Sequence, residues 1–258
     1  MKNIYFIILL SMLCLVYSCS REKPGFKVAE SYIKSDDPGE PGFHRDSLKI
    51  ITRPGGVLLT GVREIRLSPI YLVNLSRDSS SSSMGSNSFH YRYDENAIGS
   101  GNNWNNNLMP GLEAVYGFNM VNISHYNISE NRQKNLFSKP VLVRTLYYPS
   151  FSKDTLNFLP VQRNYMMVSV YNDDTNKDGF INLKDLRRFY YFDINGGQQK
   201  ALVPENYSVV RSEYDSGNDY MYVYARLDSN NNGERDEAEP THIFWIDLKD
   251  PGNTGRVY

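Results

Sequence analysis

The feature that most constrains the fold is a stretch of the chain that repeats in register over its last third. Two twelve-residue segments rich in Asp, Asn and Gly, 174–185 and 228–239, begin 54 residues apart. Each lies between two runs of aromatic and β-branched residues, and the aspartates Asp193 and Asp247 within the following runs are also 54 residues apart. Such runs are typical of strands, and Asp, Asn and Gly are ordinary turn formers. The repeat therefore predicts two copies of a strand–loop–strand unit.

The rest of the chain from residue 50 to residue 258 has the same character. Short apolar runs separated by turn residues occur at 56–59, 70–73, 114–121 and 141–148. No stretch keeps a helical period over three turns, so we expect an all-β, antiparallel domain. A unit of about this length fits a propeller blade, and Ile246-Asp247-Leu248 is similar to the strand ending of WD-type blades. The expected fold is a propeller-like β-repeat, with a β-sandwich of hairpins as the alternative.

Both repeated loops carry oxygen-bearing side chains at positions 1, 3, 5 and 12, and a glycine at position 6. The first loop offers Asp174, Asn176, Asp178, the Phe180 carbonyl, Asn182 at position 9 and Asp185. The second offers Asp228, Asn230, Asn232, the Glu234 carbonyl, Asp236 at position 9 and Glu239. This pattern resembles the calcium loop of EF-hands, in which a hard cation takes six to eight oxygen ligands. The resemblance implies Ca²⁺ as the cofactor and these twelve residues as its ligands.

The two loops differ at position 8 and in charge. The first has Ile181 there, as EF-hands do where paired loops meet, whereas the second has Arg235, which argues against EF-hand-style pairing of the loops. The first loop supplies three carboxylates at positions 1, 5 and 12, and the second supplies two, so we expect the first to bind more tightly. The alternative is a pair of turns rich in Asx residues that hold no ion.

The first loop also resembles the dockerin pattern, in which Asp-x-Asn-x-Asp-Gly is followed by Ile-Asn-x-x-Asp-Leu. Dockerins pair two loops at shorter spacing and flank them with helices. In this chain, strand-like runs precede both loops, at 164–171 and 219–226. We therefore expect EF-hand-like loops inside β-hairpins, and helices around the loop at 174–185 would favour a dockerin-like, partner-binding module instead.

The chain begins like an exported lipoprotein. Residues 4–16 form an apolar run of 13 residues, which is too short to span a bilayer and suits a signal-peptide core. Val16-Tyr17-Ser18-Cys19 resembles the lipobox of bacterial lipoproteins, which implies a signal peptide over 1–18 and lipidation of Cys19. Residues 19–49 would form a tether. The residues after the cysteine do not resemble an inner-membrane retention signal, which favours the outer membrane, facing the periplasm or the cell surface.

Composition excludes several classes of function. The formal net charge is −1, so no basic face for nucleic acid is implied. The only cysteine besides Cys19 is Cys14 in the leader, so the mature domain has no disulfide or thiolate site. No serine-hydrolase elbow, zinc-protease motif or phosphate-binding glycine loop is present.

We therefore expect a calcium-binding, lipid-anchored protein without catalytic residues. It would bind or scaffold an unknown protein or glycan, with the calcium ions in a structural role. An envelope hydrolase acting on glycans through carboxylates remains the enzymatic alternative.

Overall fold

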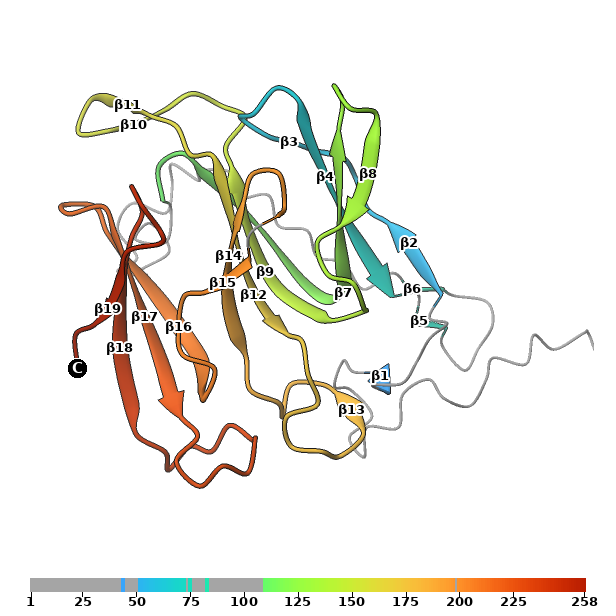
Figure 1. Cartoon of the computed structure of the whole chain (residues 1–258), viewed down its shortest axis with the longest axis vertical. Coiled ribbons are helices and arrows are strands. Elements are labelled where there is room, and N and C mark those ends of the chain that lie inside the picture. The colour runs from blue at the N-terminus through green and yellow to red at the C-terminus, as the bar shows by residue number, and fades with distance from the viewer. Residues whose placement is uncertain (1–42, 45–50, 73, 76–81, 84–108, 198) are drawn as a thin grey trace, which may run out of the picture. The chain divides into compact units, whose positions relative to one another are not determined.

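The fold was analysed in a computed structural model, which describes residues 43–44, 51–72, 74–75, 82–83, 109–197 and 199–258. Within these residues the protein is all-β, and every strand pairs antiparallel (Figure 1). The expectation of an antiparallel all-β domain is thus confirmed. The leader, Cys19 and all of the tether apart from Phe43–His44 lie outside the described residues.

The strands vary from two residues to sixteen. Those of the first part of the chain are β1 (Phe43–His44), β2 (Thr52–Pro54), β3 (Leu58–Leu59), β4 (Ile65–Leu72), β5 (Asn74–Leu75), β6 (Ser82–Ser83), β7 (Leu112–Asn127), β8 (Arg132–Asn135) and β9 (Leu142–Pro149). Those of the second part are β10 (Asp154–Leu156), β11 (Leu159–Val161), β12 (Tyr165–Tyr171), β13 (Phe180–Ile181), β14 (Arg188–Asp193), β15 (Gln199–Ala201), β16 (Tyr207–Asp215), β17 (Tyr220–Leu227), β18 (Thr241–Asp247) and β19 (Thr254–Arg256).

The larger of the two main sheets has nine strands. Its order is β15-β14-β12-β9-β7-β4-β2, with β8 added to β7 and β3 added to β4. Strand β12 is buried on both faces over its whole length. Because successive side chains of a strand point to opposite faces, Met166 and Val168 pack into one cluster while Tyr165 and Met167 pack into another. This central strand therefore separates two hydrophobic cores.

The smaller main sheet has four strands in the order β16-β17-β18-β19. On β17, Met221, Val223 and Ala225 are buried, and the tyrosines between them are only half-buried. The buried face contributes to the same cluster as Tyr165 and Met167 of β12. One core is thus shared by the two main sheets, and a second is built by residues of the nine-stranded sheet and its connections. A third, smaller cluster contains Leu72, Val121, Leu142, Tyr171 and Ile181.

The sequence repeat corresponds to equivalent parts of the two sheets. The first loop follows β12 and leads through β13 to β14, and the second connects β17 to β18. In both cases the strand before the loop pairs with the strand after it. A closed ring of blades is not shown, because β9 of the first unit continues through β7 into the rest of the nine-stranded sheet.

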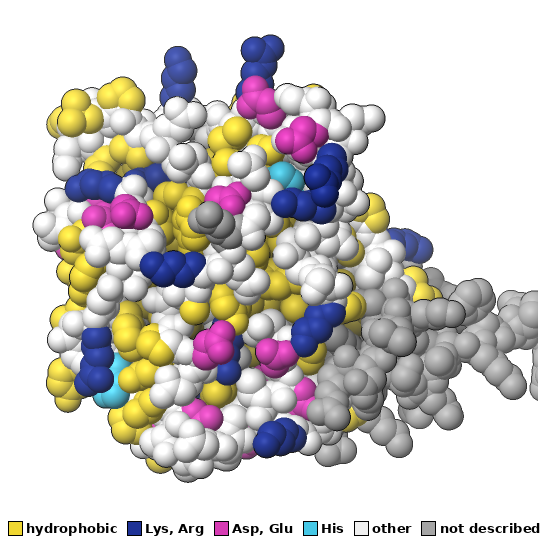
Figure 2. All heavy atoms as spheres, in the orientation of Figure 1, with side chains coloured by type: hydrophobic (Ala, Val, Ile, Leu, Met, Phe, Trp, Pro, Cys, Tyr) yellow, Lys and Arg dark blue, Asp and Glu magenta, His cyan; other side chains and the backbone are white. Residues whose placement is uncertain are grey.

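Among the described residues, no helix is long and apolar enough to cross a bilayer. Figure 2 shows basic and acidic side chains interspersed over the face in view.

Candidate metal centre

The first loop is held in shape by its carboxylates at positions 1 and 12. Asp174 Oδ2 accepts a hydrogen bond from the backbone N–H of Gly179 at 3.0 Å, across the turn from position 1 to position 6. Asp185 Oδ1 accepts from the N–H of Thr175 at 2.7 Å, and its Oδ2 accepts from the N–H of Asn182 at 2.8 Å. Two carboxylates thus fix the N–H groups of positions 2, 6 and 9.

The second loop repeats these bonds at the same positions. Asp228 Oδ2 accepts from the N–H of Gly233 at 3.1 Å, again from position 1 to position 6. Glu239 Oε1 accepts from the N–H of Ser229 at 3.0 Å, and its Oε2 accepts from the N–H of Asp236 at 3.3 Å. The longer Glu at position 12 reaches the same two N–H groups as the Asp of the first loop, so the two loops share one backbone scaffold.

Within the first loop, the side chains at positions 3, 5 and 9 meet. The side-chain amides of Asn176 and Asn182 each lie 3.3 Å from Asp178 Oδ2. Asn176 Oδ1 also accepts from the N–H of Asp178, and Asp178 Oδ1 accepts from the N–H of Phe180. Three of the expected ligand side chains are therefore gathered around one point, with oxygens available from each once the amides turn.

The second loop has the same turns along its length. Asn230 Oδ1 accepts from the N–H of Asn232 at 2.9 Å, and Asn232 Oδ1 accepts from the N–H of Glu234 at 2.8 Å. Asp236 Oδ1 accepts from the N–H of Ala238. At the same position of the first loop, Asn182 Oδ1 accepts from the N–H of Lys184. These Asx turns form the loop that an EF-hand-like site requires, and they are also what an ion-free Asx loop would contain.

Backbone angles agree between the loops as well. The residues at position 4, Lys177 and Asn231, have positive φ angles of 63° and 57°. The glycines at position 6, Gly179 and Gly233, have φ angles of 92° and 75°. Glycine adopts this region without a steric penalty, which explains why both loops keep it at position 6.

The two loops contact each other directly. Thr175 Oγ1 donates to the carbonyl oxygen of Gly233 at 2.5 Å, and Asn176 Nδ2 donates to Glu234 Oε1 at 2.9 Å. Asp185 and Glu234 form an isolated antiparallel bridge. A Cβ on Gly233 would lie only 2.0 Å from the Thr175 carbonyl oxygen, so no other residue fits there. The loops therefore join the two main sheets.

This contact differs from the pairing of EF-hands, in which residues at position 8 face each other. Here Ile181, at position 8 of the first loop, pairs with Phe43 of β1, and Phe180 pairs with His44. Position 8 of the second loop is Arg235, whose N–H donates to the carbonyl of Lys184 at 3.3 Å. The loops meet through positions 2, 3 and 12 of the first loop and positions 6 and 7 of the second. The tether contributes the strand beside position 8 of the first loop.

Burial sets the electrostatics of the first loop. Asp185 is 0% exposed, and this burial raises its pKa to about 6 even though backbone N–H groups donate to it. At position 12 of the second loop, Glu239 is also buried. A carboxylate with a raised pKa and little solvent is poised for a cation, because the charge of an ion would compensate its desolvation.

Within the described ranges, no three His, Cys, Asp or Glu side chains come together as a metal-binding group. The ligand set expected in each loop differs from such a group, because it includes Asn side chains and backbone carbonyls as well as carboxylates. Hard oxygen donors of these types are the ones that calcium takes. The donor set of both loops fits the ion.

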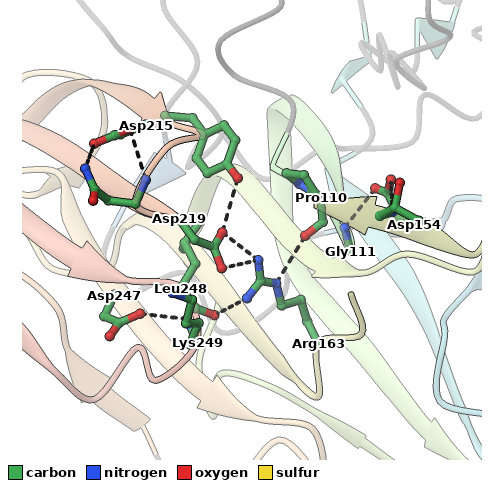
Figure 3. A network of polar contacts seen from close by, with 12 residues as sticks. Pro110, Gly111, Asp154, Arg163, Asp215, Asp219, Asp247, Leu248 and Lys249 are labelled. Carbon is green, nitrogen blue, oxygen red and sulfur yellow. Dashed lines mark hydrogen bonds and ion pairs between the residues drawn. The ribbon is translucent and has the colours of Figure 1, made fainter. Parts of the chain in front are cut away.

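A second polar cluster, which the sequence analysis missed, ties the two sheets together at Arg163 (Figure 3). Its guanidinium donates to both carboxylate oxygens of Asp219, at 2.7 and 2.8 Å, and both side chains are almost fully buried. Arg163 also donates to the carbonyls of Leu248 and Pro110, while Tyr214 donates its hydroxyl to Asp219. We call this set the Arg163 clamp.

No sequence signal marks the Arg163 clamp, because its members lie far apart in the chain and belong to no motif. The only local sign in the structure is the positive φ angle of Asp219, 61°, in the turn between β16 and β17. Every charged group of the clamp is engaged by another protein group. It therefore acts as a structural contact between the sheets.

The aspartates that repeat at the strand ends cap turns. Asp193 Oδ1 accepts from the N–H of Asn195 at 2.7 Å, and Asp247 Oδ1 accepts from the N–H of Lys249 at 2.9 Å. Both are Asx turns in equivalent hairpins.

Comparison with known proteins adds no assignment: no family model matches the chain, and no curated protein matches it.

Proposed function

We propose that this protein is a calcium-stabilised β domain that is exported and held at the membrane by a lipid on Cys19. Each of the loops 174–185 and 228–239 would hold one calcium ion in a structural role. The observation that carries the proposal is the hydrogen-bond scaffold that both loops share, position by position. Ordinary turns have no reason to agree over twelve residues, whereas two ion sites of one type do.

Calcium would act on the contact between the sheets. The two loops touch through Thr175 and Gly233, and each is rooted in a different sheet. An ion that binds only the folded loop stabilises the fold by mass action. Calcium bound in both loops would thus stabilise the contact between the two sheets at the loops. The Arg163 clamp stabilises a second contact between the sheets through its buried ion pair.

The repeat also divides the domain into two similar units. We take β9-β12-β14-β15 and β16-β17-β18-β19 as two blade-like units, each an antiparallel meander with its calcium loop between the second and third strands. The 54-residue spacing of the loops supports this division. The first unit differs because its outer strand, β9, also pairs with β7.

The position of the loops argues against the alternatives. Both are flanked by strands in the described residues, whereas a dockerin-like module would flank them with helices. The most buried charged pair, Arg163 with Asp219, is fully occupied in the clamp, so it offers no free carboxylate for glycan hydrolysis. A non-enzymatic role in binding or scaffolding at the outer membrane, with a protein or glycan partner, is therefore the function that we propose.

The test is calcium titration by calorimetry, together with thermal melts of the full chain in calcium and in chelator. We expect two binding events and a higher Tm in calcium. Asp178→Ala should remove the event of the first loop, and Asn230→Ala should weaken that of the second. Asp173→Ala is the matched control, because Asp173 is exposed, lies one residue before the first loop and forms a surface ion pair with Lys139. No heat and no change of Tm at millimolar calcium would reduce both loops to Asx turns.

A further inference from the structure

The hairpin of β10 and β11 presents apolar side chains to solvent. Phe158 is 98% exposed and Leu159 69% exposed at its tip, and Phe151 before the hairpin is 59% exposed. The hairpin forms a two-stranded sheet of its own, with no third strand among the described residues, and projects from the ends of β9 and β12 (Figure 1). Hydrophobic side chains gather at the same corner of the surface in Figure 2, at the upper left. A patch of this kind marks an interaction site.

The tip is also strained. Leu156 and Leu159 face each other as the last pair of the hairpin, so Asn157 and Phe158 form a two-residue turn. Their φ angles are 53° and 65°. A turn with two positive φ angles ordinarily has Asn followed by Gly, and the left-handed region is unfavourable for a bulky side chain. Phenylalanine at this position disfavours the fold, and at 98% exposure it gains no buried contact with the described residues in return.

Charge is absent from the tip. From Thr155 to Gln162 the sequence contains no charged residue. At the base, Asp154 accepts from the N–H of Gly111 at 2.9 Å, Arg163 lies in the clamp, and Lys153 is exposed. The hairpin is thus a neutral, apolar protrusion on a base that the rest of the domain fixes.

We propose that this tip inserts into the interfacial region of a lipid bilayer, as a second membrane contact beside the lipid on Cys19. The inference rests on the lipid anchoring proposed above and not on calcium binding. Size decides between a lipid and a protein surface. A stable protein interface buries about 800 Å² on each partner, far more than three side chains of a narrow tip provide. A few apolar side chains do suffice to hold a tip in a bilayer to which the chain is already anchored, since each one that leaves water contributes about 1.5–3 kcal/mol.

The length of the chain before the domain allows this orientation. Phe43 is 24 residues after Cys19, and a segment of that length reaches at most about 80 Å. A compact domain of this length is roughly 40 Å across. The anchor therefore permits the hairpin to reach the same bilayer, although the tether joins the domain at the first calcium loop.

The first test places a tryptophan at the tip of the full chain. Phe158→Trp is compared with Tyr258→Trp, a matched control because Tyr258 is an exposed aromatic residue, 72% exposed, at the end of the chain. Both proteins are bound to phosphatidylcholine vesicles with and without brominated acyl chains. We expect blue-shifted emission and quenching of the tryptophan at position 158 only. Equal quenching at the two positions would overturn the proposal.

The second test uses Phe158→Gly, which relieves the turn and removes the ring. We expect its Tm in solution to rise by roughly 2–4 °C. In the Cys19→Ala background, which lacks the lipid acceptor, its partitioning to vesicles should fall by roughly tenfold or more. Both proteins of this pair keep the same leader, so the difference reports the hairpin alone.

The outcomes separate the hairpin from the anchor. If the mass of the wild-type chain shows no acyl group on Cys19, the lipid anchor is wrong. Quenching of the tryptophan at position 158 in the Cys19→Ala background tests insertion of the hairpin separately from the anchor. A Phe158→Gly variant that is more stable but partitions like its parent would overturn membrane insertion. That result, with unquenched tryptophan at position 158, would assign the tip to a pocket on a protein partner.

Discussion

Gly233 shows how one residue can satisfy two requirements that the sequence pattern states only in part. The loop pattern demands glycine at position 6 for its positive φ angle. The structure adds the close approach of the Thr175 carbonyl, which leaves no room for a Cβ. The equivalent Gly179 shares the first requirement, with a φ angle of 92°.

We therefore predict that Gly233→Ala destabilises the protein by more than the backbone penalty of a positive φ angle, which is about 1–2 kcal/mol. The variant must both adopt an unfavourable φ angle and move the Thr175 carbonyl away from the new Cβ. Urea unfolding in calcium measures the loss. A loss no larger than the backbone penalty would contradict the loop contact seen in the structure.

Asp185 gives a prediction for pH. Its pKa is raised to about 6 in the folded state, so between pH 4 and 6 the folded chain binds more protons than the unfolded chain. By linkage, the calcium-free protein should lose stability as pH rises through this window, by up to about 2–3 kcal/mol. Asp185→Asn should remove this slope, and denaturant unfolding in chelator from pH 4 to pH 7 measures it.

Calcium should reverse the effect of pH at the same residue. The ion binds the ionised carboxylate, so protons compete with it below pH 6. The calcium affinity of the first loop should therefore increase as pH rises from 5 to 7. An affinity that stays constant over this range would show that Asp185 is not a ligand, even if the loop binds calcium.

At the scale of elements, the loops and the strands around them were the most predictable part of the molecule. Local patterns determine both, since turn residues and runs of β-branched and aromatic residues act over a few positions. The contact between the loops was not predictable, because Thr175 and Gly233 are far apart in sequence and belong to no pairing motif. Likewise, nothing in Phe43-His44 indicated that it pairs beside Ile181.

Thr175 gives the prediction at this scale. Its hydroxyl donates to Gly233 and accepts from the N–H of Leu186 at 2.8 Å. Thr175→Val keeps the shape but leaves both groups without their partner, which should cost about 1–3 kcal/mol of folding free energy. Calorimetry should also show the two calcium events becoming independent.

The control for this prediction is Thr155→Val, since Thr155 is exposed on β10. This variant should leave stability and calcium binding within experimental error of the wild-type chain. A loss at Thr155 equal to that at Thr175 would mean that the hydroxyl bonds between the loops contribute nothing specific.

At the scale of the whole molecule, the sequence predicted the class of fold but not the arrangement of its sheets. Antiparallel all-β structure follows from patterns along the chain. Which strands become neighbours depends on packing between residues such as Tyr165 and Met221, which share a core although 56 positions separate them. The Arg163 clamp belongs to this level too, because it exists only once the sheets have met.

The clamp predicts a large loss from a single change. Arg163→Met leaves Asp219 buried without its charge partner, which should cost about 3–5 kcal/mol. The exposed pair of Arg211 and Glu213 is the matched control, and Arg211→Met should cost under about 1 kcal/mol. Urea unfolding measures both. The loss at Arg163 should be the same in calcium and in chelator, because the clamp and the loops share no residue.

The hairpin of β10 and β11 has a consequence for the integrity of the chain. It connects β9 to β12, and these two strands also pair with each other in the nine-stranded sheet. A protease that cleaves after the exposed Phe158 would therefore cut a link between neighbours that remain hydrogen-bonded. We expect the two fragments to stay associated and to separate only on denaturation, so the protein could be assembled from two separately made halves.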